Sequence, residues 1–249
     1  GCREPGDQET PSMDISILAP SATGWGDELL SGLWITVSLA LTTLPFGLVL
    51  GLCFASLALS PSRMARGLAA AYVTVFRGLP ELLTLFILYN GLGMFLNTVL
   101  SALAHDHVAV DLSPFLTGAV ALALVFGAYA AEVFRGAFMA LPPGQVEAAF
   151  AIGMSDWQVF HRIKFPQLMR LALPGLGNLW INLIKDTALV SVIALNDVMR
   201  QGFVASNVSK QPFLIYGAVC VLYWGLCILS ETVLGWLEHR SNRGVRFVK

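Results

Sequence analysis

The chain has 249 residues, of which 56% are hydrophobic and only 12% are charged. Soluble globular domains carry about 25% charged residues, so this composition excludes an ordinary soluble domain and indicates a protein that crosses a membrane several times. The formal net charge of -1 also excludes a globally basic nucleic-acid binder. We therefore expect membrane lipid around the chain and no nucleic acid.

The N-terminal residues do not have the pattern of a signal peptide. Residues 1–12 are polar and lack the apolar stretch that such a peptide requires. Met13 is a candidate for the natural start, so residues 1–12 are left out of the fold prediction. We assign residues 1–28 to an N-terminal tail and a periplasmic-side segment, residues 29–239 to a transmembrane domain, and residues 240–249 to a cytoplasmic C-terminal tail.

Five apolar stretches are long enough to cross a bilayer, which takes about 20 residues in a helix. Arg77 and Glu81 interrupt the second stretch. Pro80 lies between them and predicts a break or kink, because proline removes a backbone donor and clashes with the preceding turn. The predicted spans are residues 29–59, 67–98, 112–138, 171–196 and 211–237.

Lysine and arginine are concentrated on one side of these spans. They follow the first span, lie between the third and the fourth, and follow the fifth, whereas the connection around residues 105–107 has none. Because positively charged loops stay in the cytoplasm, we expect the N-terminus on the periplasmic side and the C-terminus in the cytoplasm. An odd number of spans requires the same opposite placement of the two ends.

The polar segment between the third and fourth spans, residues 140–170, is the most informative part of the sequence. The Pro-Pro-Gly stretch at residues 142–144 stops the preceding helix. Residues 146–152 favour a short helix with several apolar side chains near one side, and Gly153 suits its C-terminal turn.

A second short helix is predicted in the same segment. Ser155 or Asp156 can cap it, and it runs over residues 157–165. We expect Pro166 to end it, because proline cannot continue a helix without losing a hydrogen bond. The result is two short cytoplasmic helices at an angle.

Glu147, Ala148 and Ala149 give the first of these helices a surface suited to a partner. The two alanines let another surface approach closely, and the glutamate offers a charge that an arginine or lysine of the partner could hold. From the residues alone, an amphipathic hairpin lying on the membrane surface is the alternative.

Several segments match one known family in order and spacing: residues 77–81, 129–138, 144–149, Gly153, Ile163, Pro166 and 185–191. In these segments the chain resembles the permeases of polar amino-acid ABC importers, and most closely the branch for histidine, lysine, arginine, ornithine and opines. The Glu-Ala-Ala loop with its glycine marks the importer class. The Arg-Gly-x-Pro and Lys-x-Thr-x-Leu-x-Ser elements narrow it to amino-acid uptake. Ala188 departs from the serine of many members.

The resemblance implies an all-α membrane protein with five transmembrane helices of the type I ABC importer permease fold and a cytoplasmic coupling-helix loop. It implies a bacterial inner-membrane complex with a second permease subunit of different sequence, a homodimeric ATPase and a periplasmic substrate-binding protein. ATP and Mg²⁺ would belong to the ATPase subunits, so this chain would bind no cofactor and would not be an enzyme. The residues implied to contact the ATPase are Glu147, Ala148, Ala149, Gly153, Ile163 and Pro166.

Ionisable residues at membrane depth are costly and usually face protein or water. Glu132 and Arg135 are one helical turn apart, which predicts a local ion pair. Lys185 and Asp186 are adjacent and therefore point to different sides of a helix. Lys185 could hold a backbone carbonyl or the carboxylate of a substrate.

Glu81 follows a proline in a broken helix, where freed backbone groups can also bind ligands. A carboxylate there favours a cationic side chain of a substrate, and the alternative is an ion pair with Arg77 four residues earlier. We therefore place a candidate substrate pathway at Arg77, Glu81, Lys185 and Asp186. Basic amino acids are the expected substrates, with opines or other polar amino acids as the alternative.

Other functions lack a supporting pattern. His105 and His107 have no recognised metal-ligand spacing and are expected in a solvated loop, and the four cysteines form no CxxC pair. Because the chain has no phosphate-binding loop and no hydrolase motif, an intramembrane enzyme is a poor alternative. A self-sufficient secondary transporter usually has internal repeats, which are not evident here. A scaffold subunit without transport activity is the third alternative.

Overall fold

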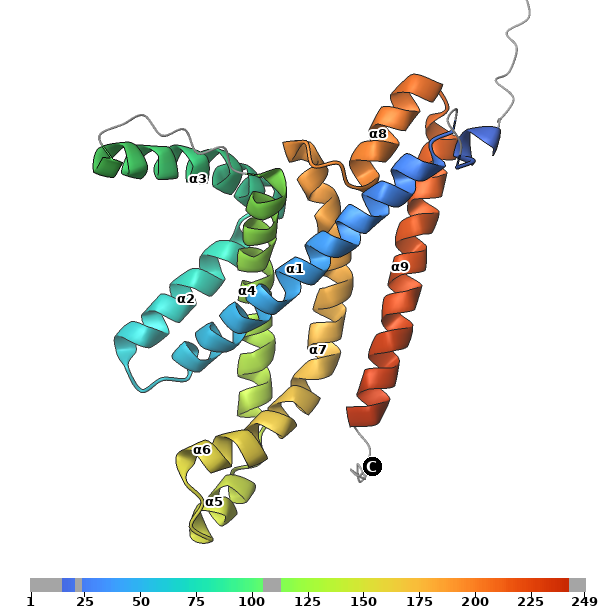
Figure 1. Ribbon diagram of the computed structural model, residues 1–249. Coiled ribbons are helices and arrows are strands. Elements are labelled where there is room, and N and C mark those ends of the chain that lie inside the picture. The colour runs from blue at the N-terminus through green and yellow to red at the C-terminus, as the bar shows by residue number, and fades with distance from the viewer. Residues whose placement is uncertain (1–14, 21–23, 105–112, 242–249) are drawn as a thin grey trace, which may run out of the picture.

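The computed structural model describes residues 15–20, 24–104 and 113–241, and nearly all of this part is helical (Figure 1). The predictions for residues 1–12, Met13, His105 and His107 lie outside the described residues. The elements in chain order are η1 (Ile15–Leu18), α1 (Gly26–Ala58), α2 (Arg63–Gly78), α3 (Glu81–Ala104), α4 (Pro114–Met139), α5 (Pro143–Ala151), α6 (Asp156–Val159), η2 (Phe160–Lys164), α7 (Phe165–Asp186), η3 (Thr187–Ile193), α8 (Val198–Ser209) and α9 (Pro212–Ser241).

Four helical stretches of the described residues are long and apolar enough to cross a membrane: α1, α4, the continuous stretch Asp156–Ile193, and α9. Helices α2 and α3 meet at a bend of 108° and are long and apolar enough only as a pair, which forms either a broken fifth span or a re-entrant loop. The bend lies where proline predicted it, between Gly78 and Glu81. Leu79 adopts an extended backbone conformation there, as a residue before proline prefers.

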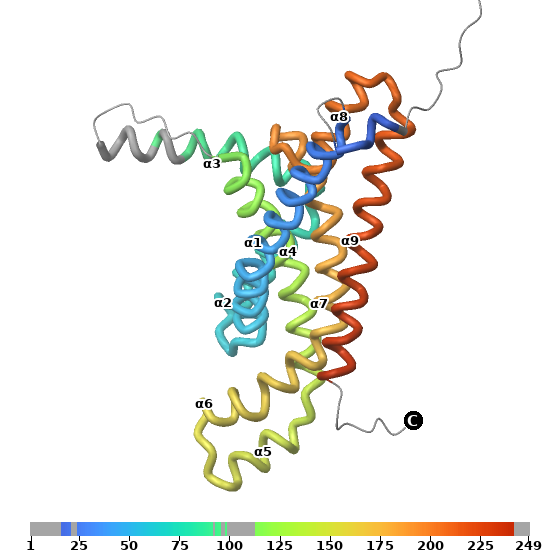
Figure 2. Tube along the Cα trace, turned by 45° about the vertical axis from the view of Figure 1, so that its right-hand side comes forward, coloured from blue at the N-terminus to red at the C-terminus, as the bar shows by residue number. Residues whose placement is uncertain are grey.

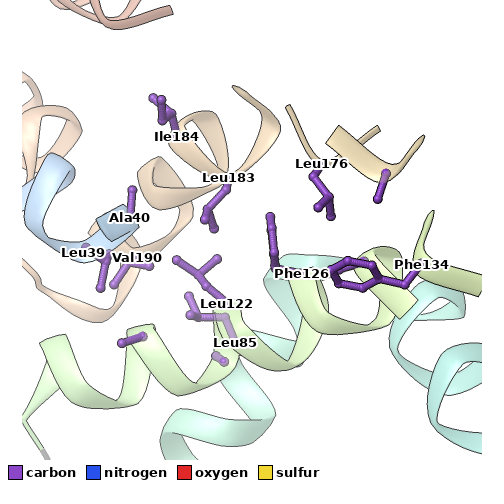
Figure 3. Close-up of a cluster of buried hydrophobic side chains, with 14 of the residues drawn as sticks. Leu39, Ala40, Leu85, Leu122, Phe126, Phe134, Leu176, Leu183, Ile184 and Val190 are labelled. Carbon is purple, nitrogen blue, oxygen red and sulfur yellow. The ribbon is translucent and has the colours of Figure 1, made fainter. Parts of the chain in front are cut away.

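The centre of the bundle is α4, a helix rich in alanine and glycine with most of its residues buried. Helix α1 packs along α4 at close range: a Cβ atom placed on Gly51 would lie 2.7 Å from the Ala130 Cβ. Around this contact, leucine, isoleucine, valine and phenylalanine side chains from α1, α3, α4, α7 and η3 form one buried cluster (Figure 3). Small residues on α4 therefore let the surrounding helices approach it.

The two ends of the bundle differ. Helices α5 and α6 project beyond the spans at the end where α9 finishes, whereas η1 and α8 lie at the opposite end (Figure 1, Figure 2). The turn that enters α8 was not predicted from the sequence. Ala194 has a positive φ of 64° there, and α8 follows with only 12 residues, too few for a span.

The prediction that Pro166 ends a separate second short helix is wrong. Helix α6 continues through the π-helical turn η2 directly into α7, so residues 156–193 form one helical stretch. Pro166 lies in the first turn of α7, where its missing N–H is tolerated, and the wider π turn before it makes room for the ring. The fourth predicted span, residues 171–196, corresponds to the later part of this stretch.

Asp197 anchors α8 to α1. Its carboxylate accepts a hydrogen bond from the Arg200 backbone N–H at 2.9 Å, which caps the helix. The next N–H, of Val198, donates to the Thr36 hydroxyl of α1 at 3.3 Å. The Asp197 side chain is fully buried, and one of its carboxylate oxygens has no hydrogen-bond partner in the described structure.

Burial raises the pKa of Asp197 from 3.8 to about 6, although three backbone N–H groups and Arg200 oppose the shift. Because the folded-state pKa is the higher one, the charged form destabilises the fold. We expect the stability of the wild-type protein to fall as the pH rises from 5 to 7.5, by about 1.4 kcal/mol from this group. The thermal midpoint in detergent, measured across this range, checks this.

Asp197→Asn isolates the contribution of this carboxyl group. Asparagine keeps the helix-capping acceptor but does not titrate, so the pH dependence should be smaller in the variant. Tyr223 of α9 faces the carboxyl and stays neutral in this range. If the thermal midpoint changes equally with pH in the variant and in the wild type, the pH dependence does not come from Asp197.

Candidate functional site

A small polar cavity lies inside the bundle between α3, α4 and α7. Its volume is about 200 Å³, and Glu81, Tyr129, Asn182 and Asp186 contribute its polar groups, while the remaining lining is leucine, valine and phenylalanine. Glu81 is the first residue of α3, just after the break, and Asp186 is the last residue of α7. The cavity therefore forms where two helices end.

The carboxyl groups of Glu81 and Asp186 line the same cavity and lie close enough for their charges to interact. Two carboxylates at this separation repel unless a proton or a cation lies between them. An apolar lining strengthens that repulsion and also strengthens the attraction for a cation. The cavity can thus bind an ammonium or guanidinium group.

The predicted pathway residues divide into two groups. Glu81 and Asp186 line the cavity, but Arg77 and Lys185 do not. Lys185 is exposed while its neighbour Asp186 is partly buried, so the two point to different sides as expected. The alternative ion pair between Arg77 and Glu81 is wrong, because Arg77 lies 4.0 Å from a Glu132 carboxylate oxygen and 5.3 Å from the centre of the Tyr129 ring.

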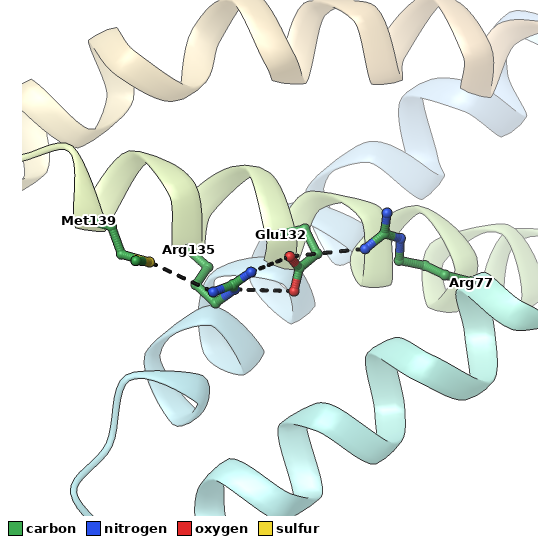
Figure 4. A network of polar contacts seen from close by, with 4 residues as sticks. All are labelled: Arg77, Glu132, Arg135 and Met139. Carbon is green, nitrogen blue, oxygen red and sulfur yellow. Dashed lines mark hydrogen bonds and ion pairs between the residues drawn. The ribbon is translucent and has the colours of Figure 1, made fainter.

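Glu132 forms the local ion pair that the sequence predicted (Figure 4). The Arg135 guanidinium donates to both of its carboxylate oxygens, through Nη2 at 2.7 Å and through Nε at 3.2 Å. Such a bidentate geometry is the strongest arrangement for this pair. The Arg77 contact to the same carboxylate is longer, so Glu132 neutralises Arg135 first and Arg77 only in part.

The loop between α4 and α7 is a compact structure outside the membrane-spanning helices. Helix α5 buries Ala149 and exposes Glu147 and Ala148. Gly153 has a φ of +81°, a conformation that glycine adopts easily, and its N–H donates to the Phe150 carbonyl at 2.9 Å. The glycine therefore closes the end of α5, as the sequence predicted.

Two contacts hold the rest of this loop. The Ser155 hydroxyl and the Gln158 side chain form a reciprocal capping box that starts α6. The Gln145 side-chain carbonyl accepts a hydrogen bond from Gln167 at 2.7 Å, which joins α5 to α7. No sequence pattern predicted this second contact, because 22 residues separate its partners.

The surface of the loop combines apolar side chains with charges. Ile152 and Trp157 are 75% and 71% exposed, although both are large and apolar. A groove of about 510 Å³ beside α5 contains both Glu147 and Lys164. Ile163 is partly buried in η2, and Pro166 is exposed at the start of α7. An exposed apolar surface with polar residues around it is typical of a protein contact.

Broken helices that line a polar cavity inside a helical bundle are common among membrane transporters. The chain belongs to the family of binding-protein-dependent transport system inner membrane components, whose sequence model matches residues 43–243. It is thus a membrane component of a transport system, and the family consists of permeases rather than enzymes.

Relatives with assigned transport systems cover almost the whole chain. The nopaline transport system permease protein of Agrobacterium fabrum is 40% identical, over 94% of this chain and 99% of the relative. The histidine/lysine/arginine/ornithine transport system permease protein of Escherichia coli is 39% identical, over 90% and 97%. A crystal structure of an amino acid ABC transporter with histidines has a TM-score of 0.74 at 30% identity, over 87% of this chain and 95% of that chain.

Proposed function

We propose that this chain is the permease subunit of an ATP-driven importer that takes up amino acids with a basic side chain from the periplasm. The observation that carries the substrate class is the pair of adjacent carboxyl groups in the cavity, Glu81 and Asp186. The family and the substrates named for the relatives support the same class. Opines and other polar amino acids are the alternative substrates, which the nopaline relative favours.

In this proposal the cationic end of the substrate binds between Glu81 and Asp186. Tyr129 and Asn182 offer hydrogen-bonding groups to the rest of the molecule. The separate binding protein selects the amino acid first, and the cavity adds a preference for positive charge. Arg77 and Lys185 do not line the cavity, so in this proposal they do not contact the bound substrate there.

The loop of residues 140–170 is the proposed contact to the ATPase. Glu147, Ala148 and Ala149 on α5 and the exposed turn at Gly153 would enter a depression on that partner, with Ile163 and Pro166 in the second arm. The support is physical: α5 is closed by Gly153 and joined to α7 through Gln145 and Gln167, so it can transmit force.

The complete importer would contain a second permease of different sequence, a homodimeric ATPase that binds ATP and Mg²⁺, and a periplasmic binding protein. The loop and the C-terminus would face the cytoplasm, and α8 and η1 the periplasm. Arg63, Arg66, Arg162 and Lys164 lie at or near the end of the bundle that we assign to the cytoplasm, in agreement with the positive-inside rule.

Glu81→Gln tests the substrate class. Loss of one charge-assisted contact corresponds to about 1.5 to 3 kcal/mol, so arginine uptake should fall about tenfold or more. The measurement is ATP-driven uptake of labelled arginine, and of a labelled neutral amino acid, by proteoliposomes that contain the whole importer.

Glu231→Gln is the matched control, because it removes the same charge from an exposed position on α9. Competition by unlabelled lysine, nopaline and glutamine ranks the substrate classes in the same vesicles. An arginine uptake and a competition profile that do not change in Glu81→Gln would remove the cavity from substrate selection.

A further inference from the structure

We propose that Glu132 is a positioning residue that keeps Arg77 away from Glu81 and so leaves the acidic cavity free for the cation of the substrate. The inference rests on the proposed function and adds a role for a residue that does not line the cavity. Sequence spacing and three-dimensional structure give different ion-pair partners for Arg77. Arg77 and Glu81 are four residues apart, yet the ion pair of Arg77 is with Glu132 of α4, 55 residues away.

Arg77 is close enough to the cavity to interfere with it. Its guanidinium lies 5.3 Å from the centre of the Tyr129 ring, and Tyr129 is part of the cavity lining together with Glu81. Tyr129 thus contacts the cation of the protein and also lines the cavity proposed for the cation of the substrate. Because arginine has a long and flexible side chain, a change of partner by Arg77 is part of this proposal.

Glu132 is the carboxylate that pairs with Arg77 beside this ring. One carboxylate oxygen of Glu132 faces both arginines, Arg135 at 2.7 Å and Arg77 at 4.0 Å (Figure 4). Without this carboxylate two guanidinium groups would lie next to each other with no anion between them, and they would repel. Arg135 is held further along α4, so Arg77 is the arginine that is free to move.

A released Arg77 has carboxylates available in the cavity, because Tyr129, which Arg77 contacts, lines that cavity together with Glu81. An ion pair with Glu81 would place a fixed positive charge where the substrate needs a negative one. The protein would then compete with its own substrate, and the apparent affinity for a basic amino acid would fall. Releasing Arg77 from Glu132 would leave the loop of residues 140–170 and its proposed contact to the ATPase unchanged.

Glu132→Gln should therefore raise the KM for arginine uptake about tenfold and change kcat much less. Glu132→Asp, which keeps the charge, should stay close to the wild type. The decisive variant is the double change Arg77→Gln with Glu132→Gln, because it removes the competing cation. We expect it to recover most of the affinity that Glu132→Gln loses.

The experiment uses the whole importer in proteoliposomes, with the amount of assembled complex measured by size-exclusion chromatography of each variant. If the double variant is as impaired as Glu132→Gln, or more so, Glu132 has a purely structural role and the inference fails. The proposed function has its own test in Glu81→Gln. If Glu81→Gln reduces arginine uptake as expected but the double variant does not regain the affinity for arginine, this inference fails and the proposed function stands.

Discussion

Replacing Gly153 by aspartate is expected to reduce ATP-driven uptake to the level of vesicles without ATP, while the subunit still enters the membrane. Among the described residues, no atom outside its immediate neighbours lies within 4 Å of a Cβ placed on Gly153, although the positive φ strains any side chain there. Aspartate is among the residues that adopt a positive φ most often, so this strain is small compared with the cost for a branched residue. The change should therefore leave this chain folded and act on the surface that meets the ATPase.

Three measurements separate the outcomes for Gly153→Asp: uptake by the reconstituted importer, the amount of the subunit in the membrane, and recovery of the ATPase with it. Gly67→Asp is the matched control, because it adds the same charge outside the loop, at an exposed position near the start of α2 that is also open. Glu147→Lys reverses a charge on the same helix and should likewise abolish uptake. Normal uptake by Gly153→Asp and by Glu147→Lys would exclude the loop as the ATPase contact.

Replacing Gly51 by valine should prevent stable accumulation of the protein in the membrane. A Cβ at this position meets the Ala130 Cβ at 2.7 Å and the Ala130 carbonyl carbon at 3.1 Å, and backbone atoms cannot move aside. Overpacking in a core costs about 1 to 3 kcal/mol and more where the backbone must shift. We therefore expect α1 to separate from α4 and the protein to be degraded.

Gly225→Val provides the comparison for this packing prediction. Gly225 is exposed on α9, and a Cβ there meets nothing within 4 Å. The membrane content of both variants, measured after equal expression, should differ at least severalfold. Wild-type amounts of Gly51→Val would show that the contact between α1 and α4 adapts, contrary to the packing argument.

Features that depend on neighbouring residues were predictable from the sequence. The break between α2 and α3 follows from Pro80 alone. The ion pair of Glu132 with Arg135 follows from a spacing of three residues on one helix. The same applies to Gly153, whose position after a short apolar run predicts the end of α5.

Features that depend on distant residues were not predictable. The acidic pair joins Glu81 to Asp186, whose positions in the sequence are 105 apart, and only the packed bundle brings them together. The N–H of Val198 donates to the hydroxyl of Thr36, which lies 162 residues earlier in the sequence. Local spacing favoured Glu81 as the partner of Arg77, whereas the fold supplies Glu132.

Pro166 failed as a stop signal for a different reason. Proline disfavours a regular α-helix at the turn before it, but a π turn places the preceding carbonyls where they need no N–H from the ring. The sequence rule describes the average helix, and η2 is an exception to it. Of the two predicted short helices, α5 is a separate element, whereas the second continues into α7.

The uninterrupted run from α6 through η2 into α7 has a mechanical consequence. Its outer end exposes Trp157 at the surface of the loop, and its inner end places Asp186 in the cavity. About 45 Å of continuous backbone joins these points, at a rise of about 1.5 Å per residue. In the proposed importer, a force applied by the ATPase at the exposed end of this stretch would be transmitted along one continuous helix and would change the separation of Asp186 and Glu81.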